Sequence, residues 1–234
     1  MSRIIFNPFT SLALLLLLGA AILILPLLFL SLIGTAFYKL GFSWIQVVLI
    51  VLATLAGSFV NIPLTRIRNR QAAVEIRFDE WSGRLYRVHA ASPTTTIAVN
   101  VGGAILPVCI SILLVSTAVR EEASSYPFIL SCIGIAAVAL VTKMLARPVR
   151  GIGIATPFFV PPLAAALAGL ILAGNVGIDA AVIAYASGTI GTLIGADIGN
   201  LHRIHDIGAP VVSIGGAGTF DGIFLSGIIA AILA

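Results

Sequence analysis

The sequence predicts an all-α polytopic membrane protein, a bundle of about seven transmembrane helices with the N-terminus inside and the C-terminus outside the cell. Three observations predict this fold: an apolar composition, seven separate apolar runs, and an uneven distribution of positive charge between them. Of 234 residues, 59% are hydrophobic and 9% are charged, whereas soluble domains carry about 25% charged residues. Mean hydropathy is +1.14, so we expect lipid to cover most of the surface.

The apolar runs have the length that a membrane-spanning helix requires, about 20 residues. Their approximate limits are 11–36, 43–63, 94–118, 127–146, 154–174, 179–200 and 208–234. The first run is too long for the apolar part of a signal peptide, and no small-residue cleavage site follows it. We therefore expect it to be retained as the first span.

Positive charge orients the predicted helices. If the N-terminus is cytoplasmic, eleven Lys and Arg residues fall on the cytoplasmic side: Arg3, Arg66, Arg68, Arg70, Arg77, Arg84, Arg87, Lys143, Arg147, Arg150 and Arg203. Only Lys39 and Arg120 fall on the other side. This bias predicts the orientation N-in, C-out, and an even number of spans would scramble it.

The cytoplasmic loop 66–93 is the only substantial polar segment. Within 74–88, apolar residues alternate with charged ones around Ser82-Gly83, the pattern of a small β-hairpin between helices 2 and 3. Two interpretations remain open. The loop arginines lie against anionic lipid, or the hairpin offers a strand edge to an extended peptide.

Internal sequence similarity suggests that the single membrane domain, 1–234, contains a parallel repeat of 1–146 and 154–234. The stretch Val99-Asn100-Val101-Gly102-Gly103-Ala104 recurs as Val212-Ser213-Ile214-Gly215-Gly216-Ala217. Both copies would cross the membrane in the same direction, related by an axis along the membrane normal. Chance similarity between glycine-rich apolar segments is the alternative.

Of the nine acids, seven fall in loops or at span ends, and only Asp197 and Asp221 are expected within the hydrocarbon. Such a residue costs about 2.5–3.5 kcal/mol at mid-membrane and usually has a function. Asp197 precedes Arg203 by six residues, or about 9 Å of helix, and Asp221 is expected at a similar depth on the next span. Two neighbouring carboxyls share a proton. The pair can then activate water and polarise a carbonyl, or load and release a proton or Na⁺.

Glycines before Asp221 make a regular helix costly, and broken backbone at membrane depth is tolerated only against protein or a wet cavity. In the repeat, Gly102 and Gly103 correspond to Gly215 and Gly216, so a similar helix break is expected in the third span. The candidate substrate-binding residues are therefore Gly215, Gly216, Gly218, Asn100, Gly102 and Gly103. By contrast, Gly191, Gly195 and Gly199 form a stripe on the helix face opposite Asp197, which predicts close helix packing.

Other chemistries find little support. His202-x-x-His205-Asp206 has metal-like spacing, but it lies at the expected cytoplasmic lip, where polar residues are normal, and we predict no metal. Motifs of zinc proteases, serine hydrolases and nucleotide-binding loops are missing, and we predict no cofactor. Cytoplasmic loops explain the net charge of +4 without nucleic acid. The expected partners are membrane lipids and either a transmembrane peptide or a small ion.

The run Gly215–Phe224, together with Gly195-Ala196-Asp197 and Asn100-x-Gly102-Gly103-x-x-x-Pro107, resembles a family of uncharacterised prokaryotic membrane proteins known as domain of unknown function 1614. The resemblance extends from about Asn61 onward. It implies a multi-pass protein of a prokaryotic inner or plasma membrane, and it implies no activity.

A looser resemblance is to the presenilin and signal-peptide-peptidase group of intramembrane aspartyl proteases, which carry one aspartate in each of two neighbouring helices. Their second aspartate follows a G-x-G motif directly, whereas Thr219 and Phe220 separate Gly218 from Asp221 here, and Ala196 replaces the usual Tyr before Asp197. The leading hypothesis is an intramembrane aspartyl protease with Asp197 and Asp221 as catalytic residues. A proton- or sodium-coupled transporter and a non-catalytic scaffold remain the alternatives.

Overall fold

The computed structural model describes residues 8–69, 74–79, 84–89, 94–149, 153–206, 208–216 and 222–234. This part of the chain is mostly helical, as predicted. Its α-helices are α1 (Pro8–Lys39), α2 (Trp44–Ser58), α3 (Leu106–Glu121), α4 (Tyr126–Leu145), α5 (Val160–Ala173), α6 (Ile178–Ala186) and α7 (Gly222–Leu233). A π-helical turn, η1 (Val101–Ile105), precedes α3, and α6 continues through η2 (Ser187–Gly191), η3 (Leu193–Asp197) and the 3₁₀ segment η4 (Ile198–Asp206).

Four helical stretches are long and apolar enough to cross a membrane: Leu12–Lys39, Val101–Glu121, Tyr126–Leu145 and Ile178–His205. Three further helices, α2, α5 and α7, are apolar but shorter, with 15, 14 and 12 residues. Each of these three falls inside one of the predicted apolar runs. The runs are longer than the helices because part of each run forms a strand or a turn.

These strands correct the all-α prediction. β1 (Asn61–Arg68), β4 (Thr94–Asn100) and β7 (Val211–Ile214) form a sheet with the order β1-β4-β7. β1 pairs with β4 antiparallel, whereas β4 and β7 are parallel, with Thr96 opposite Val211 and Val99 opposite Ile214. β4 begins with three threonines and β7 with two valines, and β-branched residues favour strands.

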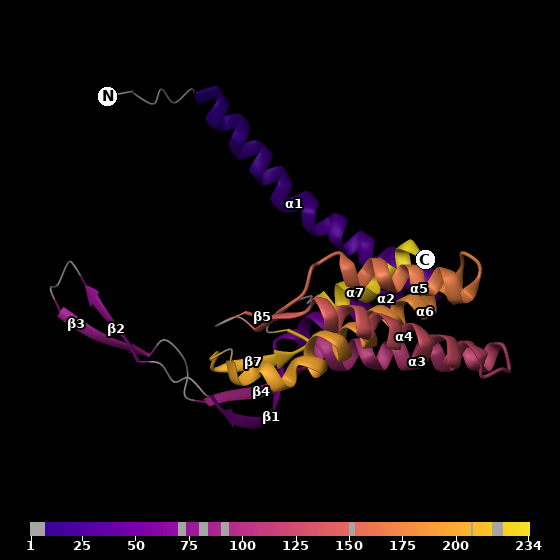
Figure 1. The fold of residues 1–234 in the computed structure, drawn as a ribbon. Coiled ribbons are helices and arrows are strands. Elements are labelled where there is room, and N and C mark those ends of the chain that lie inside the picture. Colours follow the sequence, from indigo (N-terminus) through magenta and orange to yellow (C-terminus); the bar gives the residue numbers. More distant parts are fainter. Residues whose placement is uncertain are drawn as a thin grey trace.

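Two small hairpins complete the secondary structure. β2 (Val74–Asp79) and β3 (Arg84–His89) pair antiparallel, which confirms the hairpin predicted between the second and third helices. It lies apart from the helices (Figure 1). β5 (Arg147–Val149) and β6 (Gly153–Ala155) form a second antiparallel pair between α4 and α5, which was not predicted.

Apart from the β2–β3 hairpin, the strands gather at one end of the helical bundle, which we call the sheet end, and the α3–α4 connection marks the far end (Figure 1). Exposed basic side chains at the sheet end are Arg66, Arg68, Lys143, Arg147 and Arg203. At the far end, the acids Glu121, Glu122 and Asp179 are exposed together with one basic residue, Arg120. The two ends of the bundle therefore differ in charge.

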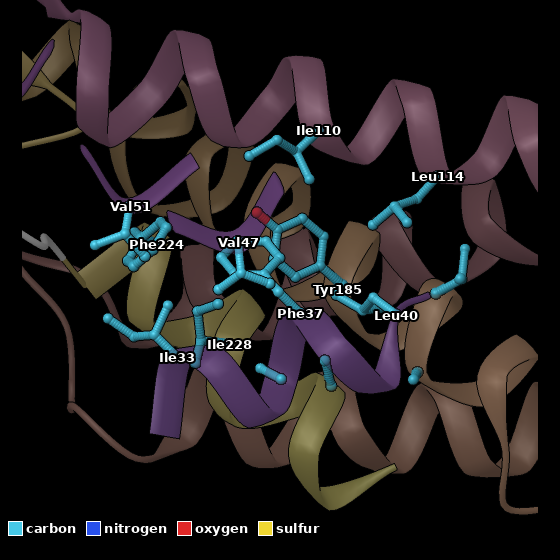
Figure 2. Packing of buried hydrophobic residues seen from close by; sticks show 14 residues of the cluster. Ile33, Phe37, Leu40, Val47, Val51, Ile110, Leu114, Tyr185, Phe224 and Ile228 are labelled. Carbon is cyan, nitrogen blue, oxygen red and sulfur yellow. The ribbon is translucent and has the colours of Figure 1, made fainter. Parts of the chain in front are cut away.

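The main apolar core lies where the last turns of α1 meet α2, α3, α6 and α7. Figure 2 shows the ring of Tyr185 among Phe37, Val47, Ile110 and Leu114. The ring centroids of Phe37 and Tyr185 are 6.0 Å apart. The earlier turns of α1 are exposed, with leucines such as Leu17 at 69%, and this part of α1 stands away from the bundle (Figure 1).

The predicted glycine stripe packs as expected. A Cβ at Gly191 would lie 2.8 Å from the Cβ of Val138, and a Cβ at Gly195 would lie 2.8 Å from the Cβ of Thr142. Both neighbours belong to α4. The stripe therefore brings the helical stretch that carries Asp197 into close contact with α4.

Replacing Phe37 by alanine should destabilise the fold by about 3–5 kcal/mol, because the ring is fully buried and its removal leaves a cavity. Leu17→Ala, on the exposed part of the same helix, is the matched control and should change stability by less than about 0.5 kcal/mol. Reversible unfolding in detergent micelles measures both. Equal effects of the two substitutions would show that α1 is anchored elsewhere.

Candidate functional site

Asp197 is the last residue of η3 and is half-buried. Its Oδ2 accepts a hydrogen bond of 2.8 Å from the backbone N–H of Gly215, which directly follows β7. A backbone N–H that donates to a carboxylate forms one of the stronger hydrogen bonds in proteins. This bond therefore holds the Asp197 carboxylate beside the turn that follows β7.

The turn that supplies the N–H depends on two consecutive glycines. Gly215 and Gly216 both have φ near +82°, a left-handed conformation that other residues rarely adopt. The N–H of Gly216 donates to the carbonyl oxygen of Ser213 at 3.2 Å and closes the turn. The break in the helix that the sequence predicts before Asp221 is thus confirmed at Gly215 and Gly216.

Asn100 is the last residue of β4 and is fully buried. Its Oδ1 accepts from the N–H of Gly103 at 2.7 Å, and its Nδ2 donates to the carbonyl oxygen of Ser58 at 2.8 Å and to Oδ1 of Asn61 at 3.1 Å. The side chain therefore caps the start of η1 and ties it to α2 and β1. Both polar atoms of the Asn100 amide therefore form hydrogen bonds within the fold.

The two glycines after Asn100 permit close approach on two sides. A Cβ on Gly102 would overlap with the backbone of Thr54 and Ser58 in α2, and a Cβ on Gly103 would overlap with the carbonyl oxygen of Gly215. The glycine breaks after β4 and β7 are therefore in direct contact. Packing connects Asn100, through Gly103 and Gly215, to the carboxylate of Asp197.

A cavity of about 300 Å³ lies beside this carboxylate at the sheet end. Its polar lining includes Asp197 and Ser213, whose hydroxyl donates to Oδ1 of Asn61 at 2.6 Å. The other lining residues are Gly153, Ile154, Leu201, Ile204, Val211, Val212, Ile214 and Gly216. The cavity thus combines an acid, strand backbone and apolar walls.

The structure brings only part of the predicted site to this cavity. Asp197 and Gly216 line it, and Gly215 binds Asp197, while Asn100 and Gly103 pack behind that turn and Gly102 faces α2. Asp221 and Gly218 lie outside the described residues. The predicted proximity of the two aspartates therefore stays a prediction.

Sequence reasoning missed several residues of the cavity. Ser213 could have been found, because the internal sequence similarity aligns it with Asn100. Gly153 and Ile154 belong to β6 and reach the cavity only through the tertiary fold. No local pattern around them indicates a site.

His205, at the lip of the bundle, contacts the backbone of the sheet. Nδ1 of His205 lies 3.2 Å from the carbonyl oxygen of Arg68 in β1. Among the residues that the structure describes, no group of three His, Cys, Asp or Glu side chains is arranged to hold a metal ion.

Gly103→Ala should destabilise the protein by about 1–3 kcal/mol, because the added methyl group must displace the backbone of Gly215. Gly222→Ala is the control: a Cβ there meets nothing within 4 Å, so this substitution should be neutral or slightly stabilising. Unfolding in detergent compares them. A Gly103→Ala protein as stable as the wild type would contradict the close contact of the two glycine turns.

One comparison with known proteins confirms the resemblance to domain of unknown function 1614. No curated protein and no solved structure matches the chain. A family model described as "Protein of unknown function (DUF1614)" matches residues 55–233, a range that contains both strand–glycine turns, the cavity and Asp197. The chain belongs to the DUF1614 family.

Proposed function

We propose that this protein is an intramembrane aspartyl protease in which Asp197 and Asp221 share a proton and cleave a membrane-embedded peptide. The observation that carries the proposal is the Asp197 carboxylate, which is oriented by the N–H of Gly215 and lines a cavity together with strand backbone. Asp221 follows the same glycine turn by a few residues, directly before α7 begins at Gly222.

The proposed topology is seven spans with the sheet end in the cytoplasm. The exposed arginines of the sheet end and the exposed acids of the far end support this orientation, because cytoplasmic ends of membrane proteins are enriched in Lys and Arg. The shorter helices α2, α5 and α7 then cross the membrane together with the strands or turns that extend them. Lipid covers the exposed leucines of α1.

In the proposed reaction, Asp197 is the general base, because the bond from the Gly215 N–H holds its carboxylate at the cavity. Asp197 takes a proton from water as the water oxygen attacks the peptide carbonyl carbon, while Asp221 gives its proton to the carbonyl oxygen. Asp197 then protonates the leaving nitrogen as the C–N bond breaks. Asp221 recovers the proton from the hydroxyl that becomes the new carboxyl group.

Asp197→Asn and Asp221→Asn should each lower cleavage of a membrane peptide by about 100-fold or more. Asparagine at position 197 keeps an oxygen acceptor for the Gly215 N–H, and at both positions it has nearly the shape of aspartate, so each substitution removes the acid. Asp179→Asn, exposed at the far end, is the control and should cleave normally. Mass spectrometry of peptides from proteoliposomes gives the rates.

Normal cleavage by either active-site variant would exclude the shared-proton mechanism. Equal loss in the Asp179→Asn control would show that the loss does not come from the proposed pair.

A second candidate, a proton- or sodium-coupled transporter, is favoured by the parallel pairing of β4 and β7, each followed by a glycine turn and an apolar helix. Related helix breaks bind ions in repeat-built transporters. Uptake driven by a pH or Na⁺ gradient in proteoliposomes, with loss in Asp221→Asn, would support transport. Cleavage without uptake would exclude it.

A further inference from the structure

Three exposed basic residues at the sheet end belong to segments that pack together. Lys143 lies in the last turn of α4, and Arg147 begins β5 two residues after α4 ends. Arg203 belongs to η4, which β5 contacts. We call the outer face of these three segments, with these three side chains, the α4–η4 surface.

Glycines bring the two helical segments of this surface into contact. A Cβ at Gly195 would lie 2.8 Å from the Cβ of Thr142 in α4. A Cβ at Gly199 would lie 3.2 Å from Cδ and 3.4 Å from Cγ of Lys143, so the stem of this lysine lies over Gly199. Residues i and i+3 share one face of a 3₁₀ helix, which places the exposed His202 on the face of Gly199.

The acid nearest in sequence to this surface is directed elsewhere. Asp197 lies between Gly195 and Gly199, but its Oδ2 accepts a hydrogen bond from the N–H of Gly215, which follows β7. Among the side chains that the structure describes, Asp197 is the one acid at the sheet end. The α4–η4 surface therefore carries net positive charge.

Exposed apolar side chains accompany the cations on both helical segments. Leu140 and Met144 are exposed on α4, and Ile194 and Ile198 are exposed on the stretch that leads into η4. Both stretches are long and apolar enough to cross a membrane. Long basic side chains at the ends of such helices reach the headgroup level while their stems lie along apolar surface. The surface therefore has a cationic part at the headgroup level and an apolar part at the level of the acyl chains.

This combination fits a phospholipid with an anionic headgroup. A phosphate group accepts charge-assisted hydrogen bonds from Lys and Arg side chains, and acyl chains cover apolar residues next to them. A soluble anion would use the cations alone and leave the apolar residues uncovered. Basic sites between membrane helices recognise anionic lipid headgroups by the same chemistry.

We propose that the α4–η4 surface binds an anionic phospholipid, with the phosphate at Lys143, Arg147 and His202 and an acyl chain along Met144 and Ile198. Such binding requires the two helical stretches to cross the membrane, and it does not depend on peptide cleavage. The lipid contacts the stretch that carries the candidate acid, but none of the five residues lines the acid's cavity.

Quenching of tryptophan fluorescence by brominated lipids tests the site, because the bromine atoms quench a tryptophan that the lipid contacts. Trp44 and Trp81, the two tryptophans of the chain, are replaced by phenylalanine. Met144→Trp or Ile198→Trp then supplies a single reporter beside the cations. Ile129→Trp, exposed on α4 near the far end, is the control reporter. Bilayers of phosphatidylglycerol and phosphatidylcholine, with one of the two lipids brominated, give the relative affinity at each reporter.

An anionic-lipid site predicts that phosphatidylglycerol is preferred roughly fivefold or more at the two reporters beside the cations. At the far-end reporter the preference should stay below about twofold, because that reporter lies away from the basic surface.

Lys143→Gln together with Arg147→Gln should lower the preference at Met144→Trp to below about twofold, because both charged donors to the phosphate are lost. Both side chains are exposed, so the fold should be kept. The matched control is Arg77→Gln together with Arg87→Gln, which removes the same charge from the β2–β3 hairpin, apart from the helices (Figure 1). This control should keep the preference.

Three results would overturn the proposal. The first is equal quenching by the two lipids at both reporters beside the cations. The second is an equal loss of preference in the two double variants, which would assign the effect to the total charge of that side of the protein. The third is loss of the preference when soluble glycerol phosphate is added in excess, which would show that a free phosphate, and not a lipid, occupies the surface.

Discussion

The hydrogen bond from the Gly215 N–H to the Asp197 carboxylate connects the parts of the candidate site that the structure describes. It requires β7 to end at Ile214, and it requires a left-handed Gly215. It also requires a glycine at position 103, since a side chain there would displace the Gly215 carbonyl. The buried amide of Asn100 holds that neighbouring turn from behind. An acid in a helical membrane stretch is thereby positioned by the backbone of a sheet.

The features predictable from the sequence are those that composition and local pattern determine. The apolar helices, the hairpin at 74–88, the glycine stripe against α4 and the break before Asp221 all follow from hydropathy, alternation or glycine content. The strands at 94–100 and 211–214 do not, because a hydropathy pattern counts apolar residues without distinguishing a buried strand from a helix. The segment Thr94-Thr95-Thr96-Ile97 therefore lies inside a predicted span although it forms a strand.

The cavity was less predictable than the acid beside it. Asp197 stands out because an aspartate inside an apolar run is costly, whereas Ile154 and Leu201 are ordinary apolar residues. They line the cavity because β6 and η4 pack near β7. The parallel pairing of β4 with β7 joins segments more than 100 residues apart. The internal sequence repeat indicates that the segments of β4 and β7 are equivalent, but it does not predict that they pair.

The separation of the Asp197 and Asp221 carboxyl groups tests the central claim most directly. Solid-state NMR of protein labelled with ¹³C at aspartate, reconstituted in lipid, measures the distance between the two γ-carbons. A shared-proton pair predicts a separation within about 6 Å, and the corresponding signal should disappear in Asp221→Asn. A separation beyond about 10 Å in both free and peptide-bound protein would contradict the account, because carboxyls that far apart cannot share a proton.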